Sequence, residues 1–344
     1  MIAVAVLIIT CPCALGLAVP VVQVVASGRL LRRGVLIKSG TALERLADID
    51  WVVFDKTGTL TEGRPELLPD DGRSASALKL AASLALASRH PLARALARAA
   101  GPVALAREVR ELPGQGMVLA TPAGEIRLGS RAFTGVAEEA GADDPELWLA
   151  EPGKAPVRFA FRDHLRGDAA MVVKAFAKAG IGVEILSGDR PAAVDRAARE
   201  IGLADHWLAG QTPDRKVARL EELAAQGRRV LMVGDGLNDA PALAAAHVSI
   251  SPTTAADISQ NAADLVFQGR DLGPVLEAWK TARRAERLVR QNFSLSFLYN
   301  AITIPIALAG LVTPLIAAVA MSSSSLIVIG NALRLSIGAE RRTR

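Results

Sequence analysis

Asp55-Lys56-Thr57-Gly58-Thr59-Leu60-Thr61 directly follows the apolar run Trp51-Val52-Val53-Phe54. The sequence therefore places a carboxylate at the end of a buried strand, followed by hydroxyls, a lysine and a glycine. An apolar run that ends in a glycine turn is typical of a parallel-sheet strand, and ligands bind beyond the carboxyl ends of such strands. We interpret this segment as a phosphate-handling loop in which Asp55 attacks a phosphoryl group and forms an aspartyl-phosphate. An ordinary polar turn would explain a lone Asp-Lys-Thr, but it explains all seven residues poorly.

Short apolar strands alternate with helices further along the chain. We expect strands at 182–186, 230–233, 248–250 and 265–267. This alternation favours a parallel, doubly wound α/β sheet. Polar residues follow these strands or open the next helix, and in such a sheet they surround Asp55. Their hydroxyl, ammonium and carboxylate groups suit phosphoryl oxygens and Mg²⁺. They are Ser187, Gly188, Asp189, Lys216, Asp235, Asn238 and Asp239.

Two long stretches carry no charge, 1–26 and 291–333. About 20 apolar residues cross a bilayer, and Gly310 with Val312-Thr313-Pro314 divides the second stretch into a hairpin, so we expect three spans. A secretory signal is the alternative for the first stretch, but it lacks a basic n-region and is too long. Arginines and lysines flank the spans on the side of the polar chain, which predicts that this side is cytoplasmic. They also explain most of the net charge of +5, so we do not expect nucleic-acid binding.

The Asp55–Thr61 motif, together with Gly234-Asp235-Gly236-Leu237-Asn238-Asp239, resembles the P-type ATPases of the haloacid-dehalogenase-like superfamily. The resemblance covers nearly all 344 residues. It implies that Asp55 is phosphorylated, that Asp235 and the Thr57 backbone join Asp55 around Mg²⁺, and that Lys216 neutralises the phosphate. Lys56, Ser187-Gly188-Asp189, Asn238 and Asp239 complete the implied catalytic set, with Ser187 in place of the usual threonine. Related phosphatases usually carry an acid two residues after the nucleophile; Thr57 stands there, so we expect a long-lived phosphoenzyme.

The stretch 67–162 interrupts the catalytic domain and resembles the small nucleotide-binding domain of heavy-metal P-type ATPases. The resemblance is carried by Ser88-Arg89-His90-Pro91, Gly114-Gln115-Gly116 and Gly129-Ser130. It implies that ATP binds here, with His90 against adenine and Gly114 and Gly116 allowing the backbone to approach the nucleotide. Arg89 replaces the usual glutamate and Ser130 the usual asparagine.

Cys11-Pro12-Cys13 lies within the first span. Pro12 removes a helix hydrogen bond, and two thiolates beside such a break form a site for soft metals. A Cys-Pro-Cys motif in the span before the Asp55–Thr61 segment, which we call the phosphorylation loop, is the signature of the P1B heavy-metal pumps. Within that class, Tyr299-Asn300 and Met321 to Ser325 resemble the Cu⁺ pumps, and Met321 and Ser325 share a helix face. The implied Cu⁺ ligands are Cys11, Cys13, Tyr299, Asn300, Met321 and Ser325.

We therefore expect an ATP-driven Cu⁺ exporter with cytoplasmic catalytic domains, in a bacterial inner membrane. Its expected partners are a copper chaperone or thiol donor on the cytosolic side and a periplasmic copper acceptor. The subtype resembles the pumps that supply copper for cytochrome oxidase assembly. The alternatives are a Zn²⁺/Cd²⁺/Co²⁺ pump, a membrane-anchored haloacid-dehalogenase-like phosphatase, and a remnant that only binds nucleotide.

The expected organisation assigns every segment of the chain. It also predicts the C-terminal part of a longer pump, because no Thr-Gly-Glu actuator motif occurs; alone, the chain would accept phosphate from ATP and release it slowly. The expected segments are a metal-site span 1–27, an amphipathic connection 28–45, a phosphorylation domain 46–66 and 163–275, a nucleotide domain 67–162, a basic connecting helix 276–291, spans 292–311 and 314–334, and a basic tail 335–344.

Overall fold

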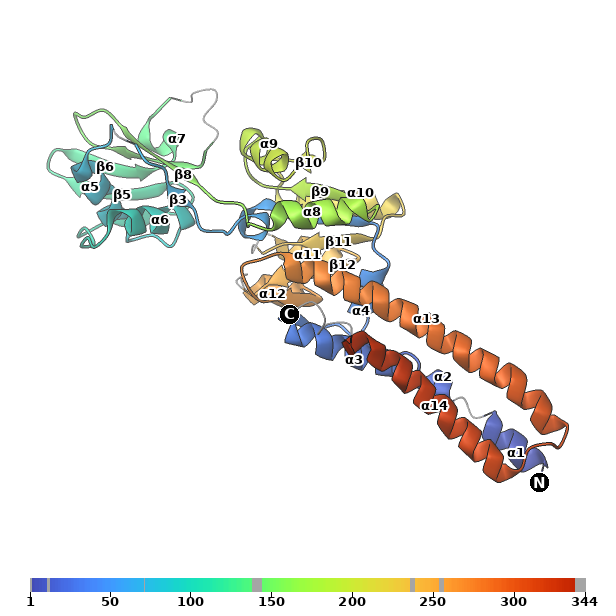
Figure 1. Ribbon diagram of the computed structural model, residues 1–344. Helices are drawn as coiled ribbons and strands as arrows, with labels where there is room; N and C mark the ends of the chain where they lie inside the picture. The colour runs from blue at the N-terminus through green and yellow to red at the C-terminus, as the bar shows by residue number, and fades with distance from the viewer. Residues whose placement is uncertain are drawn as a thin grey trace. The chain divides into compact units, whose positions relative to one another are not determined.

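The computed structural model describes residues 2–10, 13–70, 72–137, 144–235, 239–253 and 257–337 (Figure 1). By its internal contacts the chain divides into two compact units. One comprises 1–53, 171–183 and 213–344, and the other comprises 54–170 and 184–212.

A seven-stranded sheet has the order β1-β13-β12-β11-β2-β9-β10. The parallel pairs β9/β10, β11/β12 and β12/β13 confirm the expected α/β class. The apolar runs located most of its strands, and only β12 extends beyond the expected end. The strands are β2 (Trp51–Asp55), β9 (Gly182–Leu186), β10 (Trp207–Leu208), β11 (Val230–Val233), β12 (Val248–Pro252) and β13 (Leu265–Phe267). The accompanying helices are α8 (Ala169–Lys178), α9 (Pro191–Glu200), α10 (Pro213–Ala225), α11 (Ala240–Ala245) and α12 (Asp257–Ala262).

The stretch expected to be only an amphipathic connection contributes to this sheet. After α3 (Pro20–Arg32) the chain forms the edge strand β1 (Val35–Ile37), which pairs antiparallel with β13, and then α4 (Ala42–Ala47). Asp264 fastens this segment, because its backbone oxygen accepts from the Lys38 amide at 2.9 Å and its carboxylate pairs with Arg45. The first strand of the sheet is therefore built from the segment that leaves the membrane part.

The inserted stretch folds as a separate antiparallel sheet with the order β3-β8-β7-β6-β5-β4. Helices α5 and α6 pack on it around a core that includes Leu84, Leu96, Leu128, Phe159 and Phe161 (Figure 1). Ser74 caps α5 by accepting from the Ala77 amide. The elements are β3 (Glu66–Leu67), α5 (Ala75–Ala85), α6 (Pro91–Ala100), β4 (Arg110–Leu112), β5 (Gly116–Thr121), β6 (Gly124–Gly129), α7 (Arg131–Thr134), β7 (Glu146–Ala150) and β8 (Val157–Arg162).

Apolar helices form the remainder of the first unit. The N-terminal stretch is broken into α1 (Ile2–Ile9), α2 (Cys13–Leu17) and α3, and α14 (Pro314–Ile337) lies beside it (Figure 1). The stretches 2–32 and 314–336 are long and apolar enough to cross a membrane. The expected connecting helix and second span form one helix, α13 (Gly273–Leu308), because no helix breaker separates them. Near the start of α13, Trp279 packs on Phe176 of α8 with ring centroids 5.4 Å apart.

Candidate functional site: a phosphorylation loop, a nucleotide cavity and a membrane cavity

Asp55 ends β2 and is only 5% exposed. The chain then turns sharply at Gly58, whose φ of 71° is strained for any residue with a side chain. Thr61 closes this turn: its hydroxyl accepts from the Gly58 amide at 3.0 Å and donates to the Asp163 carboxylate at 2.5 Å. The backbone after Asp55 is therefore held by hydrogen bonds.

The Ser187–Asp189 segment contacts the same loop. Lys56 Nζ lies 2.5 Å from Asp189 Oδ2, and the Thr57 hydroxyl donates to that oxygen at 3.3 Å. Ser187 Oγ accepts from the Asp189 amide at 3.1 Å, which orients the carboxylate-bearing turn. Lys56 and Asp189 therefore form an ion pair beside the phosphorylation loop, an arrangement that the motif spacing did not reveal.

Arg166 and Asp163 are two site residues that sequence reasoning missed. Arg166 is only 5% exposed, and its guanidinium donates to the carbonyls of Gly58 at 2.7 Å, Thr59 at 2.7 Å and Thr61 at 3.2 Å. One planar cation therefore satisfies three carbonyls of the phosphorylation loop. The sequence context of both residues, Asp163-His164-Leu165-Arg166 directly after β8, is also typical of an ordinary surface turn.

Replacing Arg166 by methionine is expected to disorder the loop, because three buried carbonyls lose their donor. Each unsatisfied buried group costs about 1–3 kcal/mol, and misplacing a reacting group by about 1 Å can cost about 100-fold in rate. We expect phosphorylation from ATP to fall by about that factor and the melting temperature to drop. The control is Arg64→Met, which changes an exposed arginine three residues after Thr61. Equal labelling of the two variants would contradict the role of Arg166 in ordering the loop.

Two further carboxylates lie after β11. Asp239 precedes α11, and its Oδ1 lies 2.6 Å from Lys216 Nζ of α10, with both side chains buried. Asp55, Asp235 and Asp239 each offer a carboxylate oxygen, and these atoms lie within 4.8 Å of one another. Hard oxygen donors at this spacing fit Mg²⁺. Asn238, the other expected residue of this motif, lies outside the described residues.

The four expected nucleotide residues line one cavity of about 270 Å³ in the inserted domain, together with Glu111 and Glu146. They are His90, Gly114, Gly116 and Ser130. His90 Nδ1 accepts from the Leu92 amide at 3.3 Å. Desolvation lowers the pKa of His90, and the nearby Glu111 carboxylate opposes this shift. At neutral pH the ring is therefore uncharged and carries its proton on Nε2.

The backbone packing and conformation of the inserted domain require glycine at several positions around this cavity. A Cβ on Gly116 would lie 2.3 Å from the Leu128 carbonyl oxygen, and one on Gly129 would lie 2.4 Å from that of Gln115. Close packing of β5 against β6 therefore excludes side chains at both positions. At Gly114, by contrast, a Cβ would meet nothing within 4 Å, and the requirement is its φ of 76°.

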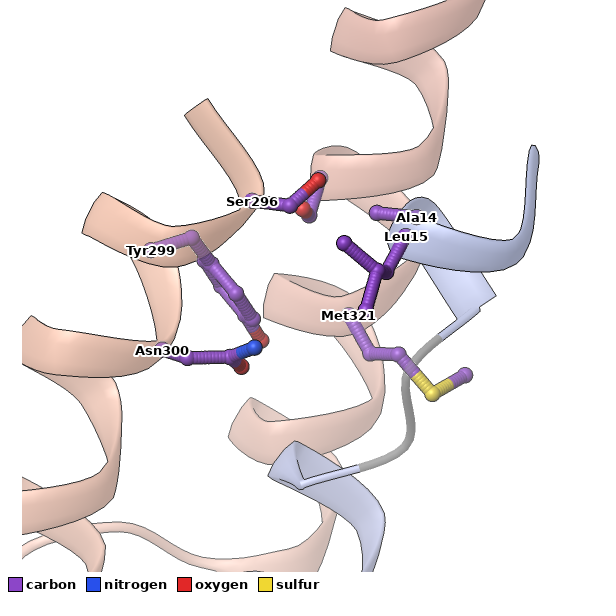
Figure 2. Close-up of a pocket in the computed structure, with 7 residues that line it drawn as sticks. Ala14, Leu15, Ser296, Tyr299, Asn300 and Met321 are labelled. Atoms are coloured by element: carbon purple, nitrogen blue, oxygen red, sulfur yellow. The ribbon is translucent and has the colours of Figure 1, made fainter. Parts of the chain in front are cut away.

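A second cavity, of about 10 Å³, lies among the apolar helices and has room for one small ion or water (Figure 2). Tyr299 and Asn300 reach it from α13 and Met321 from α14, while Ala14 and Leu15 of α2 close it. Ser296 and Ser324 complete the lining, and the Ser325 hydroxyl instead donates to the Met321 carbonyl at 3.4 Å. Cys13 begins α2 directly before the lining residues, whereas Cys11 lies outside the described residues.

Polar side chains on α13 and α14 brace the broken helix. Asn292 is fully buried, and its amide donates to the Ala18 carbonyl at 3.3 Å, where α3 is about to begin. Its own carbonyl accepts from Asn331 at 2.8 Å, and Asn331 in turn accepts from Arg334 at 2.9 Å. No local pattern predicts this network, because its two asparagines lie 39 positions apart in sequence.

Residues 49–247 match the family described as haloacid dehalogenase-like hydrolase. Among curated proteins, the chain is 52% identical over 98% of its length to the nitrogen fixation protein FixI of Rhizobium leguminosarum bv. viciae. It is 39% identical over 97% of its length to copper-transporting ATPase 1 of Rhizobium meliloti. It spans less than half of either relative, 45% and 44%.

Solved structures show the same relationship. The structure of a zinc-transporting PIB-type ATPase in the E2.Pi state is 31% identical, with a TM-score of 0.77. The match covers 95% of this chain and 56% of the length of that structure's chain. The catalytic domain of the CPx-ATPase CopB-B matches 74% of the chain and 98% of its own, with 30% identity and a TM-score of 0.59. The chain therefore belongs to the haloacid-dehalogenase-like family and, within it, to the P1B heavy-metal class of P-type ATPases.

Proposed function

We propose that the chain is the catalytic and metal-binding portion of an ATP-driven pump that exports Cu⁺ through an aspartyl-phosphate. The observation that carries the metal assignment is the small membrane cavity, which Tyr299, Asn300 and Met321 line together with residues of the α2 segment that begins at Cys13. Within the part of the chain that the structure describes, no charged side chain lines it. A thioether donor and the absence of a counter-charge both suit a soft monovalent cation.

The loop geometry supports the following phosphorylation step. An Asp55 oxygen attacks the γ-phosphorus of ATP, the bond to the β-γ bridging oxygen breaks, and ADP leaves. Asp55, Asp235 and Asp239 are positioned to hold Mg²⁺, which would neutralise phosphoryl charge. Lys216 is held by Asp239, and the Lys56–Asp189 pair braces the loop. Thr57 has no carboxylate with which to activate water, so the acyl phosphate should persist.

A divalent pump for Zn²⁺, Cd²⁺ or Co²⁺ is the second candidate. The observation that favours it is the 31% identity to the zinc-transporting structure, and FixI is named for nitrogen fixation rather than for a metal. Against it stands the uncharged lining that the described residues give the cavity. Both candidates share the membrane location, and both require a donor of metal on the cytosolic side and an acceptor beyond the membrane.

Phosphorylation of the protein by γ-labelled ATP, measured in membranes that contain it, distinguishes the two candidates. We expect stimulation by Cu⁺ under reducing conditions and little stimulation by Zn²⁺. Asp55→Asn membranes provide the background for both metals. Stimulation by Zn²⁺ alone would transfer the assignment to the divalent class without affecting the phosphorylation chemistry.

A further inference from the structure

Two carboxylates line the nucleotide cavity, and one of them already accepts hydrogen bonds from two arginines. Glu146 of β7 accepts from Arg131 and, at 2.7 Å, from Arg158 Nε, so both of its oxygens are engaged. Burial alone would raise the pKa of Glu146, but the hydrogen bonds from these arginines lower it overall. Glu146 therefore stays ionised and serves to hold the cavity wall together.

Glu111 of β4 is differently placed. Its Oε1 accepts from the Ser88 hydroxyl, and Ser88 Oγ in turn accepts from the His90 amide at 3.1 Å. The carboxylate is thus pinned to the turn that carries His90. Among the described residues, no donor reaches its second oxygen. Glu111 therefore offers the cavity an oriented acceptor, near the donor Nε2–H of neutral His90.

We propose that Glu111 selects adenine, by accepting a hydrogen bond from the 6-amino group of the base while His90 donates to a neighbouring ring nitrogen. Adenine presents a donor beside an acceptor along this edge, as the Glu111–His90 pair requires. A 6-oxo purine turns an acceptor toward the carboxylate, leaving both oxygens unpaired and in repulsion. Because Glu111 is exposed, loss of this hydrogen bond is expected to weaken binding rather than to abolish it. This proposal rests on the proposed function, which places ATP in the cavity.

The 6-position can be tested by changing the base and the residue together. Binding of three nucleotides to the purified full chain is measured by calorimetry in EDTA, so that no phosphoryl transfer occurs. ATP carries the 6-amino group, purine riboside triphosphate has only hydrogen there, and inosine triphosphate carries a 6-oxo group. The variants are Glu111→Ala and Glu111→Gln, and the matched control is Glu108→Gln, a carboxylate of the preceding loop that does not line the cavity.

We expect the wild-type chain and Glu108→Gln to bind ATP on the order of tenfold more tightly than purine riboside triphosphate. Glu111→Ala should bind both with the same affinity, which makes the coupling specific to this side chain and this amino group. Glu111→Gln keeps an acceptor for Ser88, so the His90 turn is preserved. Its amide can also donate to a 6-oxo group, so we expect weaker ATP binding and tighter inosine triphosphate binding.

The outcomes separate the two levels of inference. If the wild-type chain binds ATP and purine riboside triphosphate equally, or if Glu111→Ala keeps the tenfold preference, the role of Glu111 is overturned and ATP binding stands. If the wild-type chain binds no triphosphate at all, the nucleotide cavity of the proposed function is overturned as well.

Discussion

Replacing Asp55 by asparagine is expected to abolish phosphorylation of the chain by ATP. Asparagine has nearly the same size, so the loop held by Arg166 and Thr61 should keep its shape. Its amide oxygen, however, is a far weaker nucleophile than a carboxylate oxygen and cannot form a stable acyl phosphate. We expect acid-stable, hydroxylamine-labile label from γ-labelled ATP to fall by at least about 1000-fold, to background, as for loss of a nucleophile elsewhere.

The control for this change is Asp48→Asn. Asp48 is an exposed carboxylate shortly before the same strand, where it pairs with Arg229 at 2.7 Å. Its loss should leave labelling intact. Nucleotide affinity should be unchanged in both variants, because the inserted domain does not include either residue. Hydroxylamine-labile label that survives in Asp55→Asn would show that another carboxylate is the nucleophile.

Changing Cys11 and Cys13 together to serine is expected to remove high-affinity Cu⁺ binding. A serine hydroxyl is a hard donor that stays protonated, whereas a cysteine offers a soft thiolate. We expect Cu⁺ affinity, measured by competition with a chromophoric Cu⁺ chelator, to fall by at least about 1000-fold, given the apparent ~10–16 kcal/mol that thiolate and imidazole ligands supply in structural metal sites.

Met321→Leu provides the graded comparison. It removes one thioether while preserving volume, so a smaller loss of Cu⁺ affinity is expected. ATP binding should persist in both variants, since the nucleotide cavity lies in the other compact unit. Unaltered Cu⁺ affinity in the double cysteine variant would place the metal elsewhere and remove the basis for the export proposal.

The fold was largely predictable because its signals are local. Val230–Val233 and Gly182–Leu186 are apolar runs that end at polar turns, and such runs become buried strands. The edge strand β1 was not predictable, because three residues inside a basic segment carry no periodicity. The two helical segments expected at 276–291 and 292–311 run on as one helix, because a change from basic to apolar composition marks a change of solvent and does not end a helix.

Residues of the candidate site could be predicted only where they stand in a short sequence motif that identifies them. Asp55 and Lys216 stand in recognisable segments, and their catalytic roles stay predictions. Arg166 and Glu111 act through hydrogen bonds to residues 107 and 23 positions away in sequence, to Thr59 and Ser88, and no local pattern reports such pairs. Ser324 lines the membrane cavity in place of the expected Ser325, because one position in a helix turns a side chain by about 100°.

The length of α13 determines how far its membrane end moves when the helix tilts. From Trp279, where the helix packs on α8, to Leu308 the axis is about 44 Å long at 1.5 Å per residue. A helix of that length amplifies small rotations: a tilt of about 6° at the Trp279 end displaces Tyr299 and Asn300, which lie about two thirds of the way along and precede Pro305, by about 3 Å. Three ångströms is the length of one hydrogen bond or metal contact. A rotation too small to disturb the packing of Trp279 on Phe176 is therefore large enough to assemble or dismantle a coordination shell around a single ion.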